Sequence, residues 1–172
     1  MVSRAPAKTL VVGLGNPILC DDGVGWLVAQ RVRQALSEQY SEGSPSANAS
    51  VDVIEVCVGG LSLAELLIGY ARAVIVDAIM TGQAVPGSVC HLRIGDLPGT
   101  LNMASAHDTN LVTALRALRR YGATIPPDEC IDIVGIEVQD VWTFSETCTP
   151  EVLAGVEVAT TQVLQLIKSQ SC

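Results

Sequence analysis

The sequence predicts one α/β domain spanning residues 1–172, with a twisted, mainly parallel sheet of about five strands and helices on both faces. The first observation is length, because 172 residues suit a single domain with its own core. The second is composition: 49% of residues are hydrophobic and 3% aromatic, so aliphatic side chains must build that core. The third is the alternation of strand-like and helix-like segments, which is typical of parallel strands joined by helical crossovers.

The first half of the chain predicts two strands, each followed by a helix. Residues 8–14 are a short apolar run, and residues 23–40 carry apolar side chains at helical spacing. The polar stretch 41–50 has no periodicity and is expected to be a surface loop. Residues 51–58 predict the second strand, and residues 61–70 a short helix.

The second half continues the same alternation. Residues 73–77 are apolar and end in an acid, as expected for a central strand buried on both faces. The helix predicted from about Asp108 to Tyr121 has arginines in its last turns and Gly122 as its stop. The other expected elements are strands at 87–94 and 131–138 and a final helix opened by Thr149 and Pro150.

Charge and composition exclude several classes of partner. The net charge of −8 opposes nucleic acid and acidic membranes. Apolar runs are far shorter than the roughly 20 residues of a membrane helix. Because no signal-peptide pattern is present, we expect a cytoplasmic protein. The six cysteines include no CxxC pair, which argues against a cysteine zinc site and favours reduced thiols.

Three polar residues fall where a parallel sheet places ligands, just beyond the carboxyl ends of its strands. Asp22 follows the first strand, Asp77 ends the central strand, and His107 precedes the helix that begins near Asp108. Two carboxylates and one imidazole could form an oxygen and nitrogen metal site with open positions. Without a cation the two acids would repel each other. The three groups should therefore bind a metal or share a proton.

Each candidate also has a structural interpretation. Asp22 could simply cap the first helix, although its neighbour Asp21 is the better candidate for that cap. Asp77 would need a partner if buried, and His107 could be a plain polar residue before a helix. The other histidine, His91, is interpreted as a residue on the polar face of a strand.

Other catalytic arrangements are mostly absent. The sequence has no GxSxG elbow, no HExxH helix and no phosphate loop ending in GK[ST]. Gly13 and Gly15 begin a GxG, but Ile18 stands where a dinucleotide fingerprint needs its third glycine. A Cys20/His107 pair is compatible with the spacing, although Asp21 and its neighbouring acid would disfavour the thiolate.

Several segments in register resemble one known family. The pattern GxGNxxxxDDGxG at residues 13–25 resembles the hydrogenase maturation proteases, endopeptidases that process nickel-iron hydrogenase large subunits. VDAIMTGQAVPGSV at 76–89 looks like the family's central strand, and SAHDTNLVTALRAL at 105–118 like its histidine and helix block. VGIEVQD at 134–140 and the following Thr-Pro helix extend the match over most of the chain.

This resemblance implies a fold, an activity and a site. The fold is a three-layer sandwich of the phosphorylase/hydrolase type, and Asp22, Asp77 and His107 correspond to the family's three metal-contacting residues. The family removes a C-terminal extension from the large-subunit precursor, with nickel already inserted in that precursor as the recognition signal. Two departures are an Asp at position 22, where some members have Glu, and Glu55 in a block that differs from part of the family. Glu55 is a possible substrate contact.

Two rival interpretations remain open. VGLGNP at 12–17 also begins peptidyl-tRNA hydrolases, but their later Arg-His-Asn is missing and their substrate calls for a basic surface. A nickel chaperone or a nucleotide-binding module without hydrolysis belongs to a different class. A chaperone would hold free nickel tightly through the same three residues, whereas a processing enzyme should act only on the loaded precursor.

Overall fold

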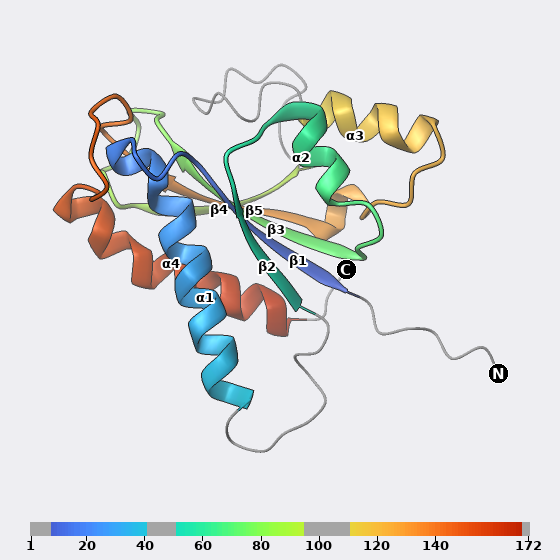
Figure 1. Ribbon diagram of the computed structural model, residues 1–172, viewed down its shortest axis with the longest axis horizontal. Helices are drawn as coiled ribbons and strands as arrows, with labels where there is room; N and C mark the ends of the chain where they lie inside the picture. Colours follow the sequence, from blue (N-terminus) through green and yellow to red (C-terminus); the bar gives the residue numbers. More distant parts are fainter. Residues whose placement is uncertain (1–7, 41–50, 95–110, 170–172) are drawn as a thin grey trace.

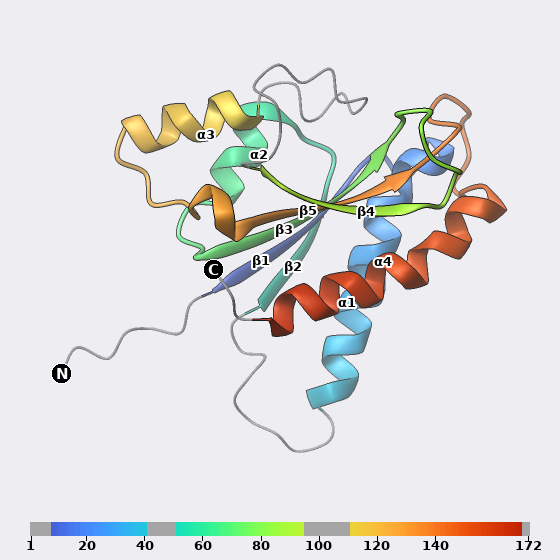
Figure 2. The same ribbon diagram turned by 180° about the vertical axis from the view of Figure 1, so that it is seen from behind.

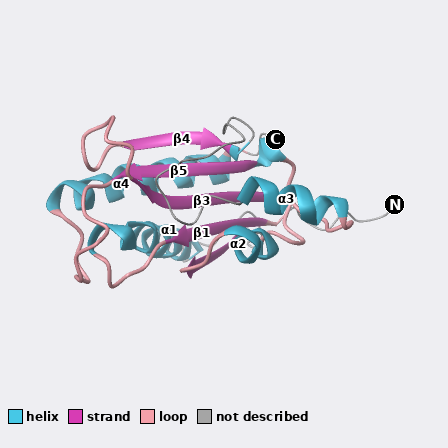
Figure 3. Cartoon of the chain, turned by 90° about the horizontal axis from the view of Figure 1, so that it is seen from above, coloured by secondary structure: helices cyan, strands magenta, loops and turns pink. Residues whose placement is uncertain are grey.

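The fold, seen in a computed structural model that describes residues 8–40, 51–94 and 111–169, is built on one five-stranded sheet. The strand order is β2-β1-β3-β5-β4 (Figures 1 and 3). Four strands are parallel: β1 (Thr9–Leu14), β2 (Val51–Val56), β3 (Arg72–Ile79) and β5 (Ile131–Glu137). The edge strand β4 (Val89–Arg93) runs antiparallel to β5. The predicted mainly parallel sheet is confirmed.

Helices cover both faces of this sheet, as predicted. On one face lie α1 (Val24–Tyr40) and α4 (Pro150–Lys168), and on the other lie α2 (Gly60–Leu66) and α3 (Leu111–Arg120) (Figures 1 and 2). Two short 3-10 helices, η1 (Cys20–Gly23) and η3 (Asp128–Cys130), precede α1 and β5. Of the described residues, no helix combines the length and apolar character needed to cross a membrane.

The three central strands are buried along their whole length, which explains their nearly continuous apolar sequences. Alternate residues of each strand enter two different cores. In β3, Val74 and Val76 pack against α1 and α4, whereas Ala73 and Ile75 pack against α2 and α3. The edge strands β2 and β4 are only partly buried. The segment 73–77 is thus the buried central strand that its composition predicted.

Glycines draw the start of α1 tightly onto the sheet. A Cβ atom on Gly25 would overlap the carbonyl oxygens of Leu14 in β1 and Val76 in β3. Gly15 has a φ of +128°, and a Cβ there would overlap the carbonyl oxygen of Asp22. The glycines of the GxGNxxxxDDGxG pattern therefore bring η1 to the carboxyl ends of β1 and β3.

One cysteine differs from the expectation of reduced thiols. Cys130, buried in η3, is disulfide-bonded, whereas Cys20, Cys57, Cys90 and Cys148 are free. Spacing along the chain could not predict this bond, because disulfide formation depends on a Cα separation that only the tertiary fold sets.

Candidate active site

The predicted residue Asp77 lies on the central strand near its carboxyl end. Its side chain is 1% exposed, and its backbone is paired with Gly135 of β5. Because its neighbours Val76 and Ala78 face α1 and α4, Asp77 is directed toward the face covered by α2 and α3. It is thus a buried acid at the edge where a parallel sheet binds ligands.

Asp22 lies in η1, which contacts β3 at the same edge of the sheet. Its side chain is half-buried, and its Oδ2 accepts a hydrogen bond of 2.7 Å from the backbone N–H of Asn16. Gly25, three residues later, lies against the carbonyl oxygen of Val76, the residue before Asp77. The backbone segments that carry the two predicted acids are therefore packed together.

The neighbouring acid, Asp21, has a different role from the predicted helix cap. That prediction is wrong, because no side chain caps η1 and Asp21 is turned into the protein with 0% exposure. Its carboxylate accepts hydrogen bonds from Thr149 N (2.7 Å) and Oγ1 (3.1 Å), Asp140 N (3.1 Å) and Gln139 N (3.3 Å). Asp21 therefore ties η1 to the segment between β5 and α4.

The third predicted residue, His107, lies outside the described residues. The helix that follows it is described from Leu111, whose buried side chain packs in the core shared by α2 and α3. Asp77 is directed toward this same face of the sheet. Among residues 8–40, 51–94 and 111–169, no three His, Cys, Asp or Glu side chains are grouped as a metal site.

Sequence reasoning missed a buried acid, Glu137, at the end of β5. Its Oε1 accepts hydrogen bonds from Thr81 N (2.8 Å) and Gly82 N (2.7 Å), and its Oε2 accepts one from Thr81 Oγ1 (2.7 Å). These bonds fix the segment that follows β3, four residues beyond Asp77. The signal that could have found Glu137 is the one that drew attention to Asp77, an acid closing an apolar strand.

Glu55, the possible substrate contact, is engaged with Arg33 of α1. Its two carboxylate oxygens accept hydrogen bonds of 2.6 and 2.7 Å from the guanidinium, and its side chain is 16% exposed. The hydrogen bond to Glu55 raises the pKa of Arg33. This pairing fastens β2 to α1 and supplies a structural reason for the acid.

Cys20 has the properties of a packed thiol rather than a nucleophile. It is 7% exposed, and burial, followed by the negative charge of Asp21, raises its pKa. Its Sγ lies 3.5 Å from the carbonyl oxygen of Thr147. The prediction that Asp21 disfavours its thiolate is confirmed, and the second acid that raises this pKa is Asp140.

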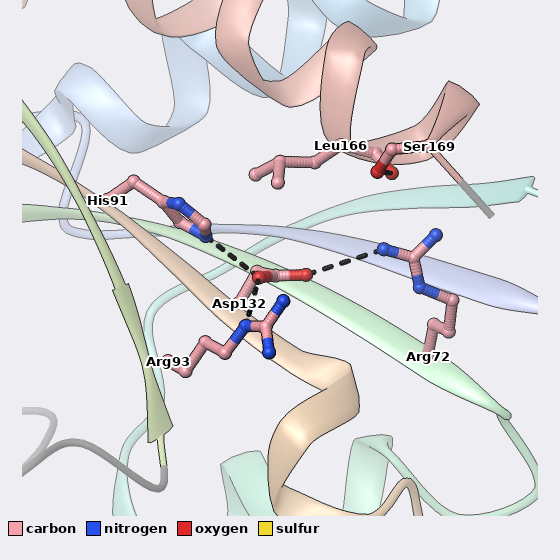
Figure 4. Close-up of polar contacts among 6 residues, drawn as sticks. All are labelled: Arg72, His91, Arg93, Asp132, Leu166 and Ser169. Carbon is pink, nitrogen blue, oxygen red and sulfur yellow. Dashed lines mark hydrogen bonds and ion pairs between the residues drawn. The ribbon is translucent and has the colours of Figure 1, made fainter. Parts of the chain in front are cut away.

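The remaining histidine, His91, belongs to a polar cluster on β3, β4 and β5. Its Nε2 lies 2.8 Å from Oδ1 of Asp132, a buried acid that also faces Arg72 at 3.5 Å and Arg93 at 3.9 Å (Figure 4). Arg72 and Asp132 lie at the amino ends of their strands, at the opposite edge from Asp77. This cluster is separate from the candidate site.

Comparisons with known proteins identify the family of this chain. A family described as hydrogenase maturation protease matches residues 30–166. The Hydrogenase 2 maturation protease of Escherichia coli (strain K12) is 30% identical over 165 residues, which cover 94% of this chain and 91% of that protein.

Two solved structures have the same fold. The hydrogenase maturating endopeptidase HybD from E. coli aligns with a TM-score of 0.76 at 25% identity, covering 95% of this chain and 94% of that one. The [NiFe] hydrogenase maturation protease HybD from Thermococcus kodakarensis aligns with a TM-score of 0.66 at 25% identity, covering 93% and 99%.

Together these findings define the chain as an α/β protein of the peptidase class. It belongs to the hydrogenase maturation protease family, so the resemblance carried by its sequence motifs is confirmed. The chain is accordingly a hydrolase that acts in hydrogenase maturation.

Proposed function

We propose that this protein removes the C-terminal extension of a nickel-iron hydrogenase large-subunit precursor and recognises that precursor by the nickel already inserted in it. The observation that carries the proposal is the placement of Asp77, buried at the carboxyl end of β3, beside the η1 segment that carries Asp22. Membership of the maturation protease family supplies the class of reaction.

In this proposal Asp22, Asp77 and His107 complete the coordination of the substrate's nickel. Carboxylate oxygens and an imidazole nitrogen form a donor set that a divalent transition metal accepts. The nickel belongs to the substrate, so it arrives together with the bond to be cut. When held by these three residues, it would position the cleavage segment and polarise a carbonyl group or a water molecule.

The surroundings argue against a thiol nucleophile and so favour hydrolysis by water. Cys20, the thiol next to the two acids, is buried with a raised pKa, so its thiolate is disfavoured. Asp21 accepts four hydrogen bonds from backbone and hydroxyl donors of the segment 139–149, which fix η1 and Asp22. Glu137 accepts three from Thr81 and Gly82, which fix the segment that follows Asp77. Such fixed loops preserve the orientation that cleavage requires.

The first experiment mixes the purified protein with large-subunit precursor in nickel-loaded and nickel-free forms. Mass spectrometry should detect C-terminal shortening of the loaded precursor, while the nickel-free precursor stays intact. Equal cleavage of both forms would contradict recognition through nickel. If neither precursor is shortened and nickel from the loaded precursor is found bound to this protein, the activity is that of a nickel-binding chaperone.

The second experiment tests the three residues individually. Asp22→Asn, Asp77→Asn and His107→Ala should each reduce processing of the loaded precursor by about a hundredfold or more while leaving the circular dichroism spectrum unchanged. Asp128→Asn is the matched control, because this acid is 46% exposed and paired with Arg119 at the opposite edge of the sheet. Wild-type processing by the three variants would assign those residues to structure.

A further inference from the structure

Three large apolar side chains are exposed next to the candidate site. Ile18 is 48% exposed, Trp142 79% and Phe144 80%. The whole chain has two tryptophans and one phenylalanine, so its single phenylalanine and one of its two tryptophans lie in these segments. Exposed aromatic clusters of this kind mark interaction sites more often than plain surface.

The three side chains come from two segments that are joined to each other. Leu19 forms isolated β-bridges with Phe144 and Ser145, and the backbone N–H of Ser145 donates to the carbonyl oxygen of Ile18 at 3.1 Å. In Figure 1 the loop that precedes α4 lies beside η1. We call Ile18, Trp142 and Phe144 the apolar rim.

Hydrogen bonds join the apolar rim to Asp21, the neighbour of Asp22. Asp140 accepts hydrogen bonds at its Oδ1 from the backbone N–H groups of Trp142 (3.1 Å) and Thr143 (2.9 Å). The backbone N–H of Asp140 in turn donates to Asp21, whose neighbour is Asp22. A surface fixed in this way loses little conformational entropy when a partner binds.

Charge adds a second feature to this surface. The two segments that form it, residues 16–25 and 139–149, contain no Lys or Arg, and their acids that reach the surface are Asp22, Asp140 and Glu146. A partner face that fits it is therefore apolar and edged by basic side chains.

We propose that the apolar rim is the docking surface for the large-subunit precursor, and that it binds an apolar, basic-edged face of the precursor next to the cleavage segment. This inference rests on the proposed function. The occupant follows from position, because the backbone N–H of Asn16, two residues before Ile18, donates to the carboxylate of Asp22. Ile18 therefore belongs to the same hydrogen-bonded segment as Asp22, and a polypeptide that brings its metal to Asp22 comes close to the apolar rim.

The test measures processing of nickel-loaded precursor by Trp142→Ala and Phe144→Ala variants. Each should raise KM for the precursor about tenfold and leave kcat nearly unchanged, because aromatic side chains at the centre of an interface carry much of its binding energy. Tyr121→Ala is the matched control, since Tyr121 is an 89% exposed aromatic just after α3 with no link to η1 among the contacts described. Wild-type KM values for both rim variants would overturn the proposal.

A readout that does not need cleavage separates this proposal from the proposed function. In a Trp26→Phe variant grown with fluorotryptophan, Trp142 carries the only fluorine, and its ¹⁹F signal should shift or broaden when unlabelled loaded precursor is added. A shift without any processing would keep the docking surface and reject the proposed function. Processing without a shift would reject the docking surface alone. If light scattering shows a dimer that Trp142→Ala converts to a monomer, a second copy of this chain occupies the surface and the proposal is wrong.

Discussion

Replacing Asp21 should cost this protein a large part of its stability, although the residue stands next to a proposed site residue. The carboxylate is fully buried and, besides a weak bond from the adjacent Cys20 thiol, accepts three hydrogen bonds from backbone N–H groups and one from the Thr149 hydroxyl. The backbone and hydroxyl donors lie 118 to 128 residues away along the chain, so their bonds join distant parts of the fold.

The magnitude follows from the donors that Asp21→Ala would leave behind. A buried donor without an acceptor costs about 1–3 kcal/mol, and water entering the space offsets part of that cost. Three backbone donors then give a loss of about 4 kcal/mol in the free energy of unfolding. Asp21→Asn keeps one acceptor oxygen but turns an amide toward the donors, so we expect about 2 kcal/mol.

Urea unfolding followed by circular dichroism measures these losses as shifts in midpoint at constant slope. Asp128→Ala provides the control, because its ion pair with Arg119 is exposed and should contribute less than about 1 kcal/mol. Stability should fall in the order wild type, Asp21→Asn, Asp21→Ala. A cost below about 1 kcal/mol for Asp21→Ala would refute the structural role given to this acid.

Two further predictions concern packing and pH. Gly25→Ala should lower the free energy of unfolding by about 3 kcal/mol, because its Cβ would overlap two backbone carbonyl oxygens; an unchanged urea midpoint would contradict this. The hydrogen bond that Tyr70 donates to Asp52 (2.7 Å), together with burial, raises the pKa of Tyr70 to about 12. Because the unfolded residue loses its proton near pH 10, this stabilisation is complete below about pH 10 and lost as pH rises toward 12. Tyr70→Phe should therefore have a lower free energy of unfolding than wild type at neutral pH, and this difference should shrink at about pH 11. A difference that stays constant with pH would contradict the role of the Tyr70 hydrogen bond.

Much of the fold could be predicted from the sequence because its signals are local. The β-branched run at 73–77 could only be a strand buried on two faces, and β3 is that strand. Gly122 stands just past α3 with a φ of +83°, as its place after the arginines predicted. The position of Asp77 at a carboxyl edge then followed from the parallel topology alone.

The roles of individual acids could not be predicted in the same way. Asp21 and Asp22 are chemically identical neighbours, and only the return of the segment 139–149 onto η1 assigns the first to structure. The sequence left Glu55, at a strand end, as a possible substrate contact, but in the fold it is paired with Arg33 of α1. In each case the partner lies 22 or more residues away, and side-chain pairing over such separations leaves no local pattern.

On the proposed function, the nickel ligands and the apolar rim are expected to act together. Three protein ligands leave the metal incompletely coordinated, so free nickel should bind weakly, and the rim alone offers a small interface. A single substrate makes both contacts, its nickel with the three ligands and its surface with the apolar rim. Each contact strengthens the other, because docking at the rim raises the effective concentration of nickel beside Asp22.

This coupling predicts that nickel-free precursor docks without being cleaved and so competes with the loaded form. Added in excess, it should raise the apparent KM for loaded precursor and leave kcat unchanged. The same excess should inhibit the Trp142→Ala variant much less, because its rim is weakened. Nickel-free precursor that fails to inhibit the wild-type protein would mean that the metal alone selects the substrate.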